Sequence, residues 1–139
     1  MSFMKCCAVG LSIALLAACG GSGTSSEAIA TAAITNAVTG RYAAFYGQLA
    51  PEVQAATTRE AFVKCMGKAS DGIPGAKATV VESTRDASYT KADGTTISAD
   101  SVTMRIETRG VTSTLVVWIV GHKVAATDPQ SDAQCMKRF

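Results

Sequence analysis

Cysteine is the residue type in this chain with the clearest chemistry, and the first informative copy is Cys19. It ends an apolar run that begins at about Ala8, and two small residues, Ala17 and Ala18, stand directly before it. A positive start, here Lys5, followed by an apolar stretch and small residues at its end, is the pattern of an export signal. The sequence therefore predicts that the chain leaves the cytoplasm.

The apolar run is too short to be a membrane-spanning helix. Such a helix needs about 20 consecutive apolar residues, whereas this run is interrupted by Gly10 and Ser12 and stops at Gly20-Gly21. A secretory signal without lipid would also end in small residues, but it would have no need of a cysteine. Cys19 is thus the residue that separates simple secretion from lipid anchoring.

The segment Leu16-Ala17-Ala18-Cys19 resembles the end of a bacterial lipoprotein signal peptide. The resemblance implies that residues 1–18 are cleaved after Ala18 and that Cys19 is acylated, with palmitate among the expected chains. Each buried methylene contributes about 0.8 kcal/mol, so two or three acyl chains anchor a protein durably. The expected location is the cell membrane or the outer membrane, with the domain on the extracytoplasmic side.

The mature chain has the size of one domain. Removing residues 1–18 leaves 121 residues, of which 19–26 form the lipidated cysteine and a Gly/Ser tether, 27–128 the domain and 129–139 a tail. The full chain has 13 basic and 11 acidic residues, and losing Lys5 with the signal leaves a net charge of about +1. This balance does not indicate nucleic acid as a partner.

The first half of the domain has helical spacing. One long helix is predicted from Glu27 to Ala50, with Gly40 inside it and Ser25 or Ser26 as its N-cap. Pro51 favours the start of a second, short helix that runs to about Ala56. The long helix is indicated by apolar residues four, four, three and four positions apart: Ile34, Val38, Tyr42, Phe45 and Leu49.

A third helix is predicted directly after the second. Thr57 and Glu60 have the spacing of a capping box, in which each side chain bonds the other residue's amide. Phe62, Cys65 and Met66 then share one face of this helix.

Everything after Gly75 is typical of strand. β-branched residues over 76–84 predict one strand, and an alternation of apolar and polar residues over 102–107 predicts another. Val111–Val120 is apolar on both faces near its end and is expected to be a central strand, and 123–127 a closing one. Turns are expected at Asp93-Gly94, Arg109-Gly110 and Gly121-His122.

The order of helices and then strands predicts an α+β fold with the helices on one face of a curved antiparallel sheet. The domain resembles the exported cone-shaped domains of the nuclear transport factor two superfamily, which are cystatin-like in outline. Trp118 here precedes the turn glycine, whereas that family usually places a tryptophan just after it. The segments that carry the resemblance are Tyr42-Ala43-Ala44-Phe45-Tyr46, Leu49-Ala50-Pro51-Glu52-Val53, Thr58-Arg59-Glu60-Ala61-Phe62 and Trp118-Ile119-Val120-Gly121-His122-Lys123-Val124-Ala125.

The resemblance implies an apolar pocket between the long helix and the concave sheet. Residues expected to line it are Tyr42, Phe45, Tyr46, Met104 and Trp118. The alternative is that these large side chains are ordinary core, as aromatic residues at helical spacing often are.

Catalytic residues are not indicated by the sequence. His122, the one histidine, stands at a predicted turn and excludes a multi-histidine metal site. The chain carries no nucleophile elbow, phosphate-binding loop or paired-cysteine metal motif. No catalytic residue, metal or cofactor is therefore predicted.

Cys65 and Cys135 form the second group of cysteines. Once Cys6 and Cys7 leave with the signal and Cys19 is acylated, they remain as an even pair in an oxidising compartment. The prediction is a disulfide that fastens the tail to the third helix. Two independent thiols are the alternative.

These features predict a membrane-anchored lipoprotein whose domain is a non-catalytic binding or interaction module at the cell envelope. Its expected partners are the membrane, through the lipid, and either an apolar small molecule or an envelope protein. A small-molecule enzyme or carrier of the isomerase or dehydratase kind, using the apolar pocket, is the alternative. A surface lipoprotein that blocks a partner at the membrane is a third reading.

Overall fold

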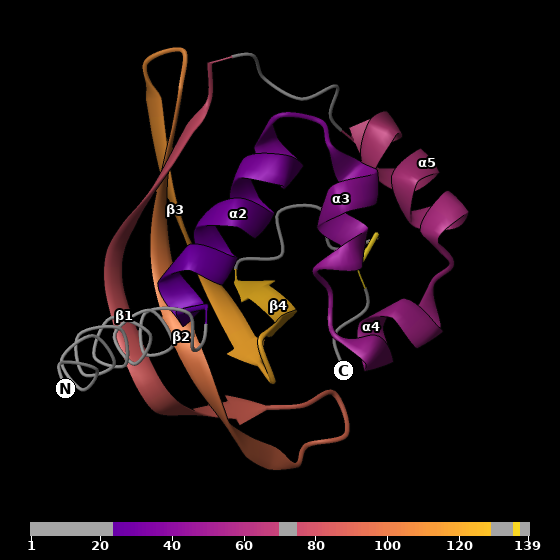
Figure 1. Cartoon of the computed structure of the whole chain (residues 1–139), viewed down its shortest axis with the longest axis vertical. Helices are drawn as coiled ribbons and strands as arrows, with labels where there is room; N and C mark the ends of the chain where they lie inside the picture. Colours follow the sequence, from indigo (N-terminus) through magenta and orange to yellow (C-terminus); the bar gives the residue numbers. More distant parts are fainter. Residues whose placement is uncertain (1–23, 70–74, 129–134, 137–139) are drawn as a thin grey trace, which may run out of the picture.

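The computed structural model describes residues 24–69, 75–128 and 135–136, and over these ranges the fold is α+β. Helices α2 (Ser26–Val38), α3 (Tyr42–Gly47), α4 (Pro51–Ala56) and α5 (Arg59–Ala69) come first. Strands β1 (Lys77–Thr90), β2 (Thr96–Thr108), β3 (Val111–Val120) and β4 (Lys123–Asp128) follow and pair antiparallel in the order β1-β2-β3-β4. Figure 1 shows the sheet curving around α2. The predicted α+β class and the antiparallel order of strands are confirmed.

The long helix predicted over 27–50 is wrong, because the chain breaks after Val38 into α2 and α3. Gly40 adopts a left-handed conformation, with φ 81°. The Arg41 amide bonds the Asn36 carbonyl at 2.8 Å and the Gly40 amide bonds the Ala37 carbonyl at 3.4 Å. This is the hydrogen-bond pattern of a glycine helix stop. The predicted N-cap is confirmed, since the Ser25 hydroxyl accepts from the Ala28 amide at 3.2 Å.

The two later helices begin almost where the sequence predicts. Pro51 occupies the first turn of α4. The cap of α5 is Thr58 rather than the predicted Thr57, because the Ala61 amide donates to the Thr58 hydroxyl at 3.2 Å. Thr57 is extended and marks the end of α4. The capping threonine therefore lies one residue later than the capping-box spacing suggested.

The sheet follows the predicted turns, with one strand longer than expected. β1 extends beyond residue 84 to Thr90, through bulges between Val80 and Glu82 and between Thr84 and Ala87. β3 lies between β2 and β4, as its apolar sequence predicted. Since side chains alternate along β2, Val102, Met104 and Ile106 face the helices.

The main core lies between the sheet and the helices. Buried small residues of α2, Ala30 and Ala33, are part of it together with apolar side chains from all four helices and from β2, β3 and β4. The edge strand β4 is also tied to the helical layer by backbone: the Ala50 amide donates to the Val124 carbonyl at 2.7 Å, and the Val124 amide to the Gln48 carbonyl at 2.8 Å.

A disulfide joins Cys65 of α5 to Cys135, which lies 70 positions later in sequence, with the two Cα atoms 5.5 Å apart. The predicted pairing is confirmed. Cys135 and Met136 are both buried and belong to the main core. The rest of the predicted tail, like the signal peptide and Cys19, lies outside the described residues.

Exchanging two glycines for alanine should change stability in opposite directions. Gly40→Ala should lower the free energy of unfolding by roughly 1–2 kcal/mol, because a side chain disfavours the left-handed conformation. Gly47→Ala should raise it by up to about 1 kcal/mol, because this helical position has nothing within 4 Å of an added Cβ.

Urea titration of both variants measures the effect. A stabilising Gly40→Ala would contradict the break between α2 and α3 and would favour one continuous helix.

Candidate functional site

The residues predicted to line one apolar pocket fall into two places. Tyr42, Phe45 and Met104 are buried in the main core, and Tyr46 packs against it. The Tyr46 ring lies 5.5 Å from that of Phe62. The Tyr46 hydroxyl donates to the Thr57 carbonyl at 2.7 Å and to the Gln54 carbonyl at 3.1 Å, so it holds α4 in place.

Trp118 belongs to a second, smaller cluster and does not join the other four. Its neighbours on β3, Val117 and Ile119, are in the main core, so the alternation of the strand directs Trp118 to the other face of the sheet. Its ring lies 5.3 Å from that of Tyr89, and its indole N–H donates to Asp128 at 2.9 Å.

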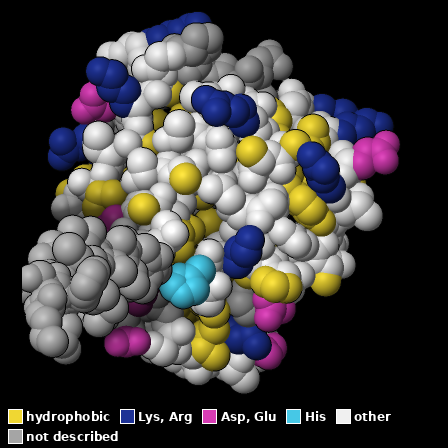
Figure 2. Space-filling model, viewed as in Figure 1, with side chains coloured by type: hydrophobic (Ala, Val, Ile, Leu, Met, Phe, Trp, Pro, Cys, Tyr) yellow, Lys and Arg dark blue, Asp and Glu magenta, His cyan; other side chains and the backbone are white. Residues whose placement is uncertain are grey.

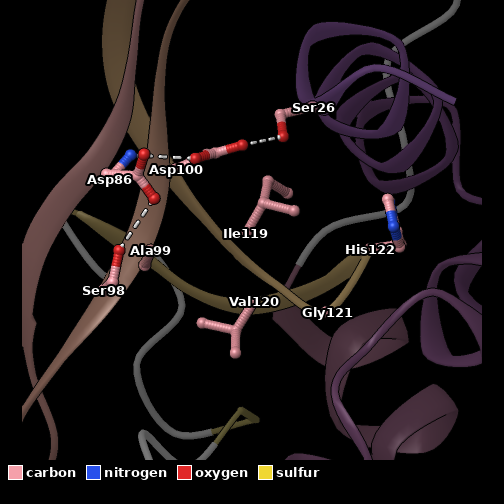
Figure 3. A pocket seen from close by; sticks show the side chains of 9 residues that line it. All are labelled: Ser26, Asp86, Ser98, Ala99, Asp100, Ile119, Val120, Gly121 and His122. Carbon is pink, nitrogen blue, oxygen red and sulfur yellow. Dashed lines mark hydrogen bonds between the residues drawn. The ribbon is translucent and has the colours of Figure 1, made fainter. Parts of the chain in front are cut away.

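A polar cleft of about 180 Å³ lies where the start of α2 meets the sheet. Figure 3 shows its side chains. Four parts of the chain contribute: the first turn of α2, a bulge in β1, the first half of β2, and the end of β3 with the turn that follows it. The lining residues are Ser26, Asp86, Ser98, Ala99, Asp100, Ile119, Val120, Gly121 and His122.

Hydrogen bonds converge on Asp100 in this cleft. The Ser26 hydroxyl donates to one carboxylate oxygen at 2.5 Å, and the Asp86 amide donates to the other at 3.1 Å. The Ser98 hydroxyl in turn donates to the Asp86 carboxylate at 3.1 Å. In Figure 3 these groups gather on one side of the cleft, and His122 lies on the other side beyond Ile119.

The backbone around the cleft is unusual at two of its residues. Asp86 has φ 52° and His122 has φ 62°, which are left-handed values that non-glycine residues rarely adopt. Asp86 lies within the second bulge of β1, and its left-handed conformation accompanies the amide contact with Asp100. His122 is exposed in its turn, as the sequence predicted.

The electrostatics keep Asp100 ionised. The hydrogen bond from Ser26 lowers the pKa of the Asp100 carboxyl most, followed by the Asp86 amide, with smaller contributions from the charges of Arg85 and His122. Close by, a hydrogen bond between Ser83 and Glu27 lowers the pKa of the Glu27 carboxyl.

A serine, an aspartate and a histidine thus share one cleft, but their arrangement does not activate the serine. In nucleophilic catalysis the imidazole stands between the hydroxyl and the carboxylate, whereas here Ser26 donates directly to Asp100. Because its pKa is lowered, Asp100 is a weak base and a poor general acid near neutral pH. The cleft can offer anionic oxygens and hydroxyls to a ligand.

Sequence reasoning missed Ser26, Asp86 and Asp100 as a group. One signal for Asp100 was present: it stands two residues before Val102 and shares the inward side of β2 with Met104. A carboxylate in register with an apolar face is expected to have a polar partner. The partner, Ser26, is distant in sequence and carries no such signal.

Among the depressions lined by described residues, two others lie elsewhere on the surface. One of about 260 Å³ surrounds the turn between β2 and β3, and a shallow groove of about 590 Å³ lies between α3 and α5. None of the three is lined by the five residues predicted for the apolar pocket. On the face seen in Figure 2, Lys and Arg side chains are scattered rather than gathered in one patch.

Two kinds of feature are absent from residues 24–69, 75–128 and 135–136. No group of three or more His, Cys, Asp or Glu residues there could hold a metal ion. The helices of the same ranges are each too short or too polar to cross a membrane.

Comparison with known proteins gives no relative: no family matches the chain, and no curated protein or solved structure is significantly similar to it.

A double-mutant cycle should detect coupling between Ser26 and Asp100. Ser26→Ala and Asp100→Ala should show an interaction energy of about 0.5–1 kcal/mol at pH 7, at the low end for a charged hydrogen bond because water screens this partly exposed pair. A lowered pKa means that the stabilisation exists above the pKa of the unfolded state. This stabilisation is lost as the pH falls through the lower pKa that Asp100 has in the folded state.

Urea titrations at neutral and strongly acidic pH measure this coupling. Ser98→Ala is the matched control, since its hydroxyl bonds Asp86 instead. Coupling that is absent at pH 7, or equal at both pH values, would contradict the assigned hydrogen bond.

Proposed function

We propose that this protein is a bacterial lipoprotein whose α+β domain is a non-catalytic binding or interaction module at the cell envelope. The observation that carries the proposal is the segment Leu16-Ala17-Ala18-Cys19, followed closely by the start of the domain. The N-cap of the first described helix is Ser25, six residues after Cys19. A cysteine just ahead of a folded domain is well placed to be its anchor.

The short connection supports a position close to the membrane. Six residues span at most about 20 Å when fully extended, so acyl chains on Cys19 would hold the start of α2 near the lipid headgroups. Ser26 and the cleft around Asp100 belong to this end of the molecule. On this proposal, the cleft is close to the cell membrane or the outer membrane, on the extracytoplasmic side.

Binding is favoured over catalysis by how the polar groups are used. The Tyr46 hydroxyl is bonded to the backbone around α4, and Asp100 accepts from Ser26 and Asp86 as a stable anion. Both arrangements are suited to structure or recognition. The resemblance to cone-shaped domains of the nuclear transport factor two superfamily is part of the proposal, and the alternative that it carries is a small-molecule carrier or enzyme with an apolar ligand between the helices and the sheet.

Cys19→Ala should abolish lipid labelling. The acyl chains need the cysteine sulfur at the cleavage site, so metabolic labelling with a palmitate analogue should lose all signal from this variant. Cys7→Ala is the matched control, because Cys7 lies within the predicted signal and its loss should leave labelling intact. Unchanged labelling of Cys19→Ala would refute the anchor.

Native mass spectrometry of the protein purified from its own cell tests the binding role. The acylated chain, released from detergent in the gas phase, should carry no additional mass beyond the lipid. A retained apolar molecule would instead favour the small-molecule carrier or enzyme reading.

A further inference from the structure

The first part of β1 is an exposed strand edge. β1 is the outermost strand of the sheet, and no other described strand pairs with its outer edge. Residues 77–82 are exposed except for the half-buried Ala78, and two of them are large and apolar: Val80 is 38% exposed and Val81 is 51% exposed. Figure 1 shows the start of β1 and the turn between β2 and β3 extending past the helices. The backbone of such an edge can pair with another strand.

The rest of the sheet perimeter is less suited to pairing. At the opposite edge, the Val124 amide and carbonyl of β4 both bond the segment 48–50. Farther along β1, a second bulge between Thr84 and Ala87 interrupts the strand, and a bulge disturbs the ladder of backbone groups. The segment 77–82 is therefore the part of the described edges best able to accept a strand.

The side chains at the start of β1 alternate between the two faces of the sheet. Ala78 and Val80 pair with residues of β2 that belong to the main core, so both lie on the inward face. Lys77 and Thr79 consequently lie on the outward face. An added strand must match this alternation.

Two opposite charges stand at the ends of the segment. The first bulge of β1 inserts Val81, after which Glu82 pairs with Thr103 on the outward face. Lys77 and Glu82 are thus exposed on the same face. Among the described residues, neither side chain has a hydrogen bond or an ion pair. Both charges are available to a partner strand.

A second copy of the segment, running antiparallel, complements the first. With a two-fold axis at Thr79, the two Thr79 residues lie opposite one another, and Ala78 lies opposite the partner's Val80. Lys77 then lies opposite the partner's Glu82, because the two residues of a bulge together oppose one residue. Symmetry makes the last two contacts twice. Opposite charges directly across an antiparallel pair are favourable, whereas like charges there are unfavourable.

We propose that β1 pairs antiparallel with β1 of a second copy of this chain over residues 77–82, which joins the two sheets edge to edge. A stable complex usually buries about 1,200–2,000 Å² in total. Pairing of so short a segment buries less, so the dimer should be weak and depend on protein concentration. This inference goes beyond the proposed function and does not require that Cys19 be acylated.

Charge exchange tests the pairing in the full chain. Sedimentation equilibrium in a density-matched detergent, with micelles in excess over protein, should show a monomer–dimer equilibrium for wild type. Lys77→Glu and Glu82→Lys should each weaken dimerisation at least about 10-fold, because each places like charges opposite one another twice. The double variant K77E/E82K restores opposite charges and should dimerise within about 3-fold of wild type.

Two features of the chain make this test specific. Lys64→Glu is the matched control, because it makes the same charge change at an exposed lysine of α5 and should leave dimerisation unchanged. Lys77 also lies opposite Glu107 of its own β2, so Lys77→Glu can act within one copy. Rescue by Glu82→Lys cannot, since Lys77 and Glu82 of one strand are about 15 Å apart.

Cross-linking tests the register. A short bismaleimide should link two copies of Thr79→Cys, which stands at the two-fold axis, several times faster than two copies of Thr84→Cys, which lies beyond the paired segment. Wild type treated in the same way accounts for the native cysteines.

Three outcomes would overturn the proposal. A wild type that stays monomeric at every concentration would leave the edge to a different occupant. A dimer that Lys77→Glu does not weaken, or that K77E/E82K does not restore, would use another surface. Equal cross-linking of Thr79→Cys and Thr84→Cys would contradict pairing about Thr79.

Discussion

The packing of α2 against the inner face of the sheet is the contact on which the rest of the structure depends. Ala30 and Ala33 are completely buried, and their small side chains let the helix approach the strands closely. Val102 and Met104 on β2 and Val117 on β3 form the facing surface, each also completely buried. Burial of this apolar area is the main favourable term available to a domain of this size.

The same contact creates the polar cleft. The first turn of α2 lies against β1 and β2. There the Ser83 hydroxyl donates to the Glu27 carboxylate, and the Ser26 hydroxyl donates to the Asp100 carboxylate. The second bulge of β1 turns the Asp86 amide toward the same carboxylate. A helix end and a strand bulge thus each donate a hydrogen bond to the same carboxylate, that of Asp100 on β2.

Much of the sheet could be predicted from the sequence because its signals are local. The alternation of Val102, Met104 and Ile106 sets the inward face, and the glycines at 110 and 121 mark the turns. The bulges that carry β1 to Thr90 depend on pairing with β2, so the sequence of β1 alone does not show them.

The break in the predicted long helix has a local cause that the periodic spacing of apolar residues does not show. Apolar spacing continues across Gly40, because Tyr42 and Phe45 face the same core as Ile34, yet the backbone stops one helix and starts another there. Similarly, the helical spacing of Tyr46 does not show that its hydroxyl reaches the carbonyls of Gln54 and Thr57. A repeating pattern records which side chains face the core and carries no information on where the backbone is interrupted.

The Cys65–Cys135 disulfide fixes the position of a segment that strand pairing does not hold. Apolar burial fixes α2 on the sheet without any covalent help, and backbone pairing at Val124 fixes β4 to the segment after α3. Cys135 comes after the last strand and has no ladder to hold it, so its place depends on the bond to Cys65. A covalent link is most effective at such a position, because the unlinked chain would lose the most conformational freedom in reaching it.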